Sequence, residues 1–483
     1  MYMARPNILL IHTDQQRWDA VGLNGNDEII TPNMDRIGES GVNFDRYFVQ
    51  APVCMPSRAS YLTGQYPSQL GIFSNGVPLP EQAETLPRMV SNVGYTSASI
   101  GKLHFVNHVN RDYRSRHPHY GFHHLEVSDE PGTYHDDYRA WVKQHAPAEL
   151  DNVSWGPSPA YKDWLTMMGI DDGISHLEKQ AREAVAFPGD SSFTHSAFVA
   201  DQCMAFIDAH ADDPPFLCLA GFYPPHSVPR ADHPWMAPEE FLALYDPDDL
   251  TLPEFPSAVD EERKTREHFD DETLREAVHG YYAMVSHVDH HIGRLLDHLA
   301  DRQLAENTLV IFTSDHGEYL GEHLKYGKGF PGEDAASRVP LMIRWPNGIE
   351  SPGRTVHDIV EAVDLVPTIL DAVGVQIPPH LRGASLLPAF TGDPLEHDGS
   401  ALIEGQGQVQ GRASVGRALR TDQYHYIMWP NGTESLYDLH ADDGKYCDVV
   451  DSDVYSERLS DLRRRLLTRL NGVTVPQERT WRY

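Results

Sequence analysis

PNILLIHTDQ, at residues 6–15, is a short apolar run that ends in a carboxylate and an amide. Its length and composition predict a buried strand of a parallel sheet. Similar apolar runs stand at residues 95–100, 216–222 and 308–313, and segments with helical spacing separate them. Strands that alternate with helices predict an α/β fold with a large, mostly parallel sheet that helices cover on both faces.

Two stretches depart from this alternation. Residues from about 105 to 190 are rich in His, Asp, Pro, Gly and Trp and have weak periodicity. A segment of this length predicts an insertion over the site or a surface for a partner. Residues 251–266 are rich in proline and charge, which predicts a surface loop.

The pattern changes after about residue 388. Short runs typical of antiparallel strands follow, and a basic helix is expected at residues 456–470. We therefore expect a large domain over residues 1–388 and a smaller antiparallel α+β subdomain over residues 389–483.

The composition excludes several classes of function. The chain has 483 residues, and 39 Lys and Arg against 71 Asp and Glu give a formal net charge of −32. Such a surface repels DNA, RNA and anionic lipid, so we expect neither a nucleic-acid nor a membrane partner. The first residues lack the long apolar core of a signal peptide, so the cytoplasm is the expected location.

Polar side chains follow the ends of four predicted strands. Asp14 and Gln15 follow the first, Lys102 and His104 the second, His226 the third, and Asp315 and His316 the fourth. In such sheets, sites form beyond the carboxyl ends of the strands. Two carboxylates with an amide oxygen and an imidazole nitrogen suit a divalent cation such as Ca²⁺ or Mn²⁺.

The segment from Cys54 to Gly64 reads CMPSRASYLTG. Pro56 suits the first turn of a helix that Gly64 would end. Cys54 then lies at the N-terminus of that helix, where amide groups and the helix dipole favour an anion. A buried cysteine before a short helix is the alternative interpretation.

These segments, in this order, resemble the sulfatase family. Cys54-x-Pro56-x-Arg58, continuing to Gly64, matches the signature in which the cysteine is converted to formylglycine, an aldehyde residue. The resemblance extends from Pro6 to about Leu386, and the tail resembles the family's C-terminal subdomain. It implies an alkaline-phosphatase-like fold and a catalytic function for the large domain. A formylglycine-generating enzyme would be the partner during maturation.

The resemblance also implies a role for each site residue. Asp14, Gln15, Asp315 and His316 would bind the metal together with the modified Cys54, and Ca²⁺ is the family's metal. Arg58 would orient the hydrated aldehyde, and Lys102 would bind both this diol and the sulfate. His104 would deprotonate the second hydroxyl group. His226 and Lys328 would bind sulfate oxygens and protonate the leaving group.

Two departures keep a second activity open. Many sulfatases carry a second aspartate at the position of Gln15 and an asparagine at that of His316, whereas phosphonate monoester hydrolases share Gln15 and His316 with this chain. Those hydrolases lack the counterparts of Lys102 and His104, which favours the sulfatase. Asn75 matches one of their substrate-contacting positions. A phosphonate monoester or phosphodiester hydrolase is therefore the alternative. A non-catalytic protein with a relic site is disfavoured, because the set from Asp14 to Lys328 is intact.

The sequence leaves the alcohol part of the substrate open among aryl, sugar and alkyl groups, and a homo-oligomer is compatible with it. Further histidines have weaker patterns. Those at 287, 290 and 291 share a predicted helix, for which we favour a solvated face over a metal site. The histidines at 117, 119, 123 and 124 lie in the expected insertion and are candidates for the substrate entrance, with surface loop as the alternative.

Overall fold

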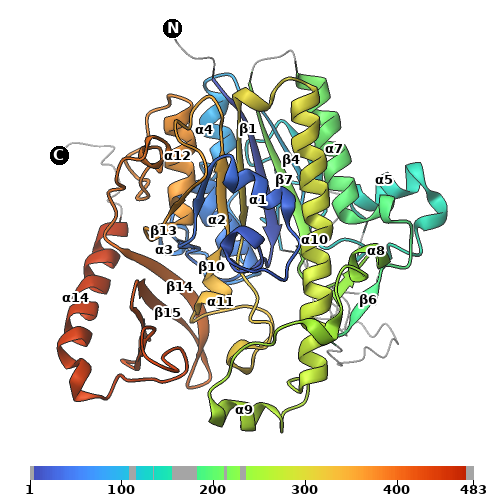
Figure 1. The fold of residues 1–483 in the computed structure, drawn as a ribbon. Helices are drawn as coiled ribbons and strands as arrows, with labels where there is room; N and C mark the ends of the chain where they lie inside the picture. The colour runs from blue at the N-terminus through green and yellow to red at the C-terminus, as the bar shows by residue number, and fades with distance from the viewer. Residues whose placement is uncertain are drawn as a thin grey trace, which may run out of the picture.

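The computed structural model describes residues 5–107, 116–133, 135–154, 182–211, 215–228 and 235–474. A large central sheet lies between two layers of helices (Figure 1). A smaller sheet, which includes β14 and β15, packs with helix α14 beside this core. The expected α/β architecture with an antiparallel C-terminal sheet is confirmed.

The main sheet contains eight strands within the described residues. Their order is β12 (Arg354–Val356), β2 (Val42–Phe44), β11 (Leu341–Arg344), β9 (Thr308–Ser314), β1 (Asn7–Asp14), β7 (Phe216–Pro225), β4 (Thr96–Gly101) and β5 (His124–Val127). All neighbours pair in parallel except β11, which is antiparallel to both β9 and β2. Strand β1, which comes from residues 6–15, is therefore a central strand with helices over both of its faces.

Alternate residues of β1 enter two different cores. Leu9 and Ile11 pack in the core that includes residues of α1 (Pro32–Glu39), α7 (His195–His210) and α10 (Asp271–Asp301). Ile8 and Leu10 pack in the other, with residues of α2 (Cys54–Thr63), α4 (Leu86–Ser91) and α12 (Leu365–Ala372). Each buried Leu or Ile contributes about 1.5–3 kcal/mol, so both helical layers hold the sheet firmly.

The C-terminal sheet has the strand order β14 (Ser400–Val409), β15 (Arg412–Thr421), β16 (Tyr424–Met428) and β17 (Glu434–Asp438), all antiparallel. Leu402, Leu419 and Leu436 share a core with Leu462 and Leu466 of α14 (Ser456–Val473). The sheet also contacts the large domain, because Glu404 N donates to the carbonyl oxygen of Gln50.

Three local expectations need correction. The predicted loop at residues 251–266 contains a helix, α9 (Ser257–Arg263), which follows Pro256 and has an acidic first turn. The region from about 105 to 190 is not only an insertion, since β5 forms an edge of the main sheet and α5 (Asp137–His145) contacts α7. The histidines at 123 and 124 lie at the start of β5, opposite the strand ends that carry the site, so they do not line its entrance.

The remaining described elements are short. They are β3 (Tyr47–Phe48), α3 (Pro67–Leu70), β6 (Ala184–Ala186), β8 (Trp235–Ala237), α8 (Glu239–Leu242), α11 (Asp334–Ser337), β10 (Arg338–Val339), β13 (Val360–Glu361) and α13 (Pro388–Thr391). In the part of the chain that the structure describes, every helix is too short or too polar to traverse a lipid bilayer.

Candidate active site

The predicted polar residues come together at one edge of the main sheet. β9, β1, β7 and β4 are parallel neighbours, so their carboxyl ends meet there. β1 ends at Asp14, and the residues that follow the other three ends are Asp315, His226 and Lys102.

Close contact between two glycines fixes the end of β4 against β7. A Cβ atom on Gly101 would lie 2.1 Å from the carbonyl oxygen of Gly221, so no larger residue fits there. Lys102 N donates to the same oxygen at 2.7 Å. This hydrogen bond sets the direction in which the chain leaves β4, toward Lys102 and His104.

Helix α2 brings Cys54 to this edge. The helix begins at Cys54 and ends before Gly64, whose φ of 68° is a left-handed conformation that favours glycine. All of its residues are buried. Both helix boundaries agree with the sequence prediction.

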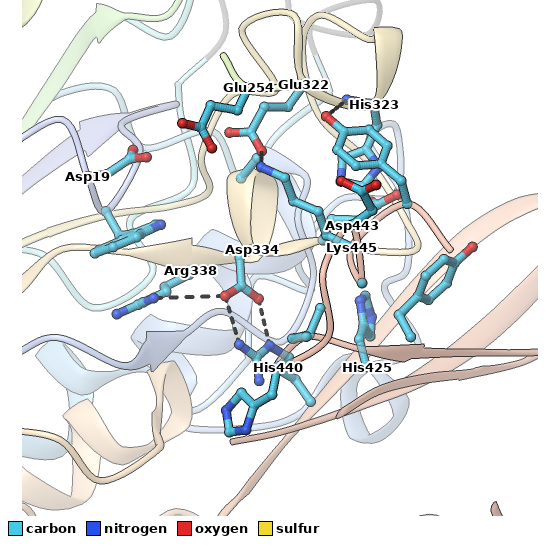
Figure 2. Close-up of a pocket in the computed structure, with 18 of the residues that line it drawn as sticks. Asp19, Glu254, Glu322, His323, Asp334, Arg338, His425, His440, Asp443 and Lys445 are labelled. Carbon is cyan, nitrogen blue, oxygen red and sulfur yellow. Dashed lines mark hydrogen bonds and ion pairs between the residues drawn. The ribbon is translucent and has the colours of Figure 1, made fainter. Parts of the chain in front are cut away.

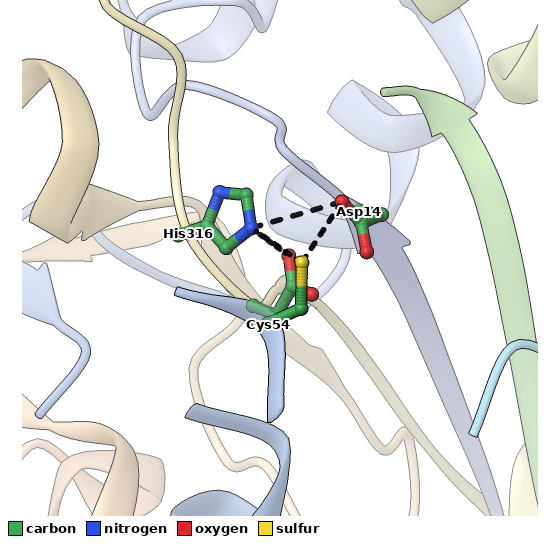
Figure 3. A group of neighbouring side chains, drawn as sticks. Asp14, Cys54 and His316 are labelled. Atoms are coloured by element: carbon green, nitrogen blue, oxygen red, sulfur yellow. Dashed lines mark hydrogen bonds and ion pairs between the residues drawn. The ribbon is translucent and has the colours of Figure 1, made fainter. Parts of the chain in front are cut away.

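Asp14, Cys54, Asp315 and His316 form a compact buried cluster. Their potential ligand atoms all lie within 4.8 Å of one another (Figure 3). The sulfur of Cys54 lies 3.2 Å from His316 Nε2 and 3.9 Å from Asp14 Oδ1. In the other described residues, no second group of three or more His, Cys, Asp or Glu side chains meets this spacing.

The His316 ring has a defined orientation. Its Nδ1 atom lies 2.9 Å from the carbonyl oxygen of Gly317 and donates its proton there. The lone pair of Nε2 therefore faces the cluster, 3.5 Å from Asp315 Oδ1. An imidazole held in this way is suited to bind a cation.

Gln15 completes the donor set in an unusual backbone conformation. Its φ is 72°, which is strained for a residue with a side chain. Its amide Nε2 donates to Glu318, so its Oε1 is the atom available to the site. Two carboxylates, one amide oxygen and one imidazole nitrogen are thus a donor set that suits a divalent cation such as Ca²⁺ or Mn²⁺.

Arg58 links the two carboxylates of the cluster. Its Nε lies 2.7 Å from Asp315 Oδ2 and its Nη2 lies 3.1 Å from Asp14 Oδ2, with all three side chains fully buried. Lys102 Nζ adds an ion pair to Asp14 Oδ2 at 2.7 Å. Each carboxylate therefore has one oxygen paired with a cationic side chain, and its other oxygen lies in the cluster.

The two carboxyl groups differ in acidity. Burial opposes ionisation of Asp14, but Lys102 and Lys328 outweigh it and hold its pKa well below the ordinary value. Burial raises the pKa of Asp315 to about 6, against the attraction of Arg58, and the negative charge of Asp14 adds to this shift. A bound cation would favour the ionised form of both.

Lys328 points into the cluster from the loop after β9. Its Nζ lies 2.8 Å from the sulfur of Cys54 and 3.2 Å from Gln15 Oε1. Burial opposes its charge, but Cys54 and Asp14 raise its pKa above the ordinary value, so it stays protonated. Lys328 therefore places a positive charge directly on the candidate nucleophile.

Tyr223 supports two of the predicted residues and was missed by sequence reasoning. Its hydroxyl group lies 3.0 Å from His226 Nδ1 and donates to the carbonyl oxygen of Ser227 at 2.8 Å. Its ring lies under Lys102, with Nζ 4.6 Å from the ring centroid. Burial, together with Lys328, lowers the pKa of His226 well below its usual value, so the imidazole is neutral at rest.

Asp129 is a second residue that the sequence analysis missed. Its Oδ1 accepts hydrogen bonds from Leu103 N at 2.9 Å and His104 N at 2.8 Å. These bonds hold His104 in a left-handed conformation with a φ of 56°. Asp129 follows the end of β5, so the strand-end rule applied to that edge strand would have found it.

Asn75 contacts the start of α2. Its Oδ1 accepts a hydrogen bond at 2.9 Å from Met55 N, the residue after Cys54. The side chain is exposed, next to the buried N-terminus of the helix. A contact between Asn75 and the substrate stays a prediction.

The histidines of α10 lie away from this cluster. His287 and His291 are buried, with their Nε2 atoms 3.2 Å apart, whereas His290 is exposed. The expected solvated face is therefore wrong for His287 and His291. Burial lowers the pKa of His287 to about 3, so its imidazole is neutral.

Comparisons with known proteins agree with this geometry. Residues 6–375 match the family model described as Sulfatase, and residues 321–471 match the one described as N-sulphoglucosamine sulphohydrolase, C-terminal. The arylsulfatase of Clostridium perfringens is 28% identical, over 97% of this chain and 95% of its own. The ulvan-active sulfatase of Formosa agariphila is 30% identical, over 91% of this chain and 76% of its own.

A solved structure gives the same fold. The phosphonate monoester hydrolase of Agrobacterium radiobacter has a TM-score of 0.79 and 24% identity, and the match covers 97% of this chain and 96% of that one. The matched sulfatase family model, together with the strand-end cluster, defines a hydrolase of the alkaline phosphatase superfamily. The chain belongs to the sulfatase family and is a sulfuric ester hydrolase.

Proposed function

We propose that this enzyme hydrolyses sulfate monoesters with a formylglycine formed from Cys54. The position of the Cys54 sulfur carries the proposal, since it lies 2.8 Å from Lys328 Nζ among buried ionic groups. A structural cysteine is more often packed among apolar side chains. In the unmodified chain, the sulfur stands for an oxygen atom of the hydrated aldehyde. A formylglycine-generating enzyme is the partner that would carry out the conversion.

The metal ligands in this proposal are Asp14, Gln15, Asp315, His316 and the modified Cys54. The oxygen-rich set favours Ca²⁺, and the His316 nitrogen makes Mn²⁺ the alternative. When bound, the cation would supply positive charge that lowers the pKa of a hydroxyl group on the nucleophile. The direction of the His316 ring toward the cluster, set by its hydrogen bond to the carbonyl oxygen of Gly317, supports its place in the set.

The first chemical step transfers the sulfuryl group to the enzyme. One hydroxyl oxygen of the hydrated aldehyde attacks sulfur, while the bond from sulfur to the alcohol oxygen breaks and the alcohol leaves with a proton. Lys102 would hold a sulfate oxygen. Lys328 would neutralise the charge that develops on the leaving oxygen, and His226 would pass a proton to it.

The second step releases sulfate without attack of water on sulfur. His104 would take the proton of the remaining hydroxyl group, the carbon–oxygen bond to sulfate would break, and the aldehyde would form again. Addition of one water molecule then restores the diol and balances the hydrolysis. Asp129 accepts hydrogen bonds from the backbone N–H groups of Leu103 and His104, and this fixed backbone supports the role of the imidazole.

Local positive charge would allow an acidic protein to bind an anion. The formal net charge of the chain is −32, yet Arg58, Lys102 and Lys328 all lie against the cluster. Sulfate would therefore meet a cationic pocket within a negative surface.

A phosphonate monoester or phosphodiester hydrolase is the second candidate. The structural likeness to the phosphonate monoester hydrolase and the presence of Gln15 and His316 favour it. Lys102 and His104 favour the sulfatase. We also propose that the catalytic domain spans residues 1–388 and that the C-terminal subdomain begins at about residue 389.

Steady-state rates distinguish the two candidates. The substrates are 4-nitrophenyl sulfate, bis(4-nitrophenyl) phosphate and 4-nitrophenyl phenylphosphonate, which share one leaving group. We expect the largest kcat/KM for the sulfate. A larger value for the phosphonate would reject the sulfatase proposal in favour of the second candidate.

A further inference from the structure

A large cavity lies between the main domain and the C-terminal sheet, and none of its lining residues belongs to the proposed catalytic set. Its volume is about 850 Å³, within the usual range for small-molecule sites. In Figure 2, Glu254 and Glu322 lie across this space from His425 and His440. The cavity is thus built from both parts of the chain and is separate from Cys54.

The charges that line the cavity exclude an anionic ligand. Eight carboxylate side chains face five Arg or Lys side chains there. Asp334 stays ionised, since burial is outweighed by Arg420 and its pKa falls to about 2. The pKa of Glu322 is also held at about 2, where Arg17 and Lys445 overcome burial. A sulfate, phosphate or carboxylate would meet net repulsion.

Most of these charges are already paired with one another. Arg420 Nε and Nη2 bind the two oxygens of Asp334 at 2.6 and 2.8 Å. Lys445 Nζ lies 2.8 Å from Glu322 Oε2, and Arg17 binds the other oxygen of Glu322. Each of these paired groups retains hydrogen-bonding capacity toward neutral hydroxyl groups.

His425 adds an unsatisfied polar atom to the wall. Its side chain is 2% exposed, and its Nε2 has no hydrogen-bond partner among the described residues. Burial lowers its pKa to about 4, so the ring is neutral. A buried polar atom without a partner is unfavourable, and a hydrogen bond with a ligand hydroxyl group would remove that cost.

Aromatic rings supply the remaining walls. Trp18, Phe255, Tyr437 and Tyr446 line the cavity and are partly exposed. Tyr446 packs beside His323, with 4.6 Å between ring centroids. Flat apolar surfaces among hydrogen-bonding groups match a ligand that has both C–H faces and hydroxyl groups.

We propose that this cavity binds a neutral oligosaccharide. The paired carboxylates and guanidinium groups would bind its hydroxyl groups, His425 Nε2 would complete one of these contacts, and the rings would pack on the sugar faces. The excess of carboxylates disfavours sulfated or uronic acid units in the cavity. The proposal concerns a binding site and does not depend on the chemistry at Cys54.

A glycan array tests the proposal directly. The array carries neutral, uronic acid and sulfated oligosaccharides, and the protein is Cys54→Ala, which prevents turnover. We expect binding of neutral oligosaccharides that falls at least about tenfold in His425→Ala and Tyr446→Ala. Amide hydrogen exchange at residues 434–446 should slow when an oligosaccharide that binds on the array is added to the protein. This measurement locates the site without any variant.

Three results would overturn it: no binding of any neutral oligosaccharide, binding confined to charged ones, or binding that neither variant weakens. Spermidine, a flexible cation, is the contrasting probe, and binding of spermidine alone would also reject the proposal. In protein that retains Cys54, each of the two variants should keep wild-type turnover of 4-nitrophenyl sulfate. This result would show that the variants fold.

The same variants show whether the bound sugar is part of the substrate or a separate glycan. This assignment rests on the proposed function. A loss of kcat/KM on a sulfated polysaccharide, with none on 4-nitrophenyl sulfate, would assign the bound units to the unsulfated part of the substrate. Unchanged kcat/KM on both, with binding on the array weakened, would assign them to a separate glycan.

Discussion

The ammonium group of Lys328 lies 2.8 Å from the sulfur of Cys54. The two residues are 274 positions apart in the chain, and only the return of the loop after β9 toward α2 brings them together. Because the pKa of Lys328 is raised by Cys54 and Asp14 against the effect of burial, this contact joins a permanent positive charge to the proposed nucleophile.

Lys328→Ala should slow the enzyme most for substrates with poor leaving groups. In the proposed mechanism Lys328 neutralises charge on the departing oxygen, and loss of such a donor costs about 10²–10³ in rate. We expect kcat to fall by this whole factor with phenyl sulfate. The decrease should be smaller with 4-nitrophenyl sulfate, because its leaving group is more stable as an anion. Lys325→Ala, nearby but with its amine paired to Glu333, is the control. Equal decreases in kcat for both substrates would show that Lys328 does not stabilise the leaving group.

His104→Ala should trap the enzyme as its covalent sulfate ester. The first step does not require this imidazole, whereas release of sulfate does, so the ester accumulates. Mass spectrometry of the peptide that contains residue 54 should show the added sulfate after incubation with 4-nitrophenyl sulfate. A variant that is slow but carries no added mass would place His104 in another step.

Asp315→Asn should reduce both the metal content and turnover. The substitution removes one of the two carboxylates of the cluster and weakens the contact with Arg58. Elemental analysis of protein purified without added metal should find about one equivalent of Ca²⁺, or of Mn²⁺, in the wild type and less in the variant. Asp371→Asn, at an exposed position, is the control. Unchanged metal content and turnover in Asp315→Asn would show that the proposed metal site is wrong.

Several parts of the fold and site were predictable because they depend on local patterns. The strand ends that carry Asp14 and Asp315 follow apolar runs that are buried on both faces, and parallel strands must bring their carboxyl ends together. The end of α2 at Gly64 is a similar case, since the left-handed conformation is a local property of glycine.

Other features depend on packing that one segment does not encode. His287 and His290 are three residues apart on α10, yet only His287 turns into the interior, where it meets Thr194. Tyr223 supports Lys102 and His226 through its place inside β7, where its aromatic side chain resembles any other buried residue of a strand. The helix α9 was missed because it is short, follows a proline and is itself mostly charged, so it has no clear apolar face.

Burial of His287 should make the protein less stable in mild acid. Its pKa is lowered to about 3 in the folded chain, from an ordinary value of 6.5. The unfolded chain therefore takes up the proton first as pH falls, and the free energy of unfolding should decrease by up to about 1.4 kcal/mol per pH unit between about 6.5 and 3.

Urea unfolding at several pH values checks this dependence. His287→Gln should reduce the slope of unfolding free energy against pH over the range from about 6.5 to 4.5 by about that amount. His357→Gln, in which the replaced side chain is 69% exposed, is the control and should keep the wild-type slope. A wild-type slope in His287→Gln would mean that this imidazole is not held neutral by folding.

The mass of the peptide that contains Cys54, measured in preparations of known activity, tests the central claim most directly. Coexpression with a formylglycine-generating enzyme should raise the fraction of peptide in which the thiol is replaced by an aldehyde. The account predicts that turnover of 4-nitrophenyl sulfate rises in proportion to this fraction and is absent in Cys54→Ala. Full turnover by protein whose Cys54 is entirely unmodified would contradict it.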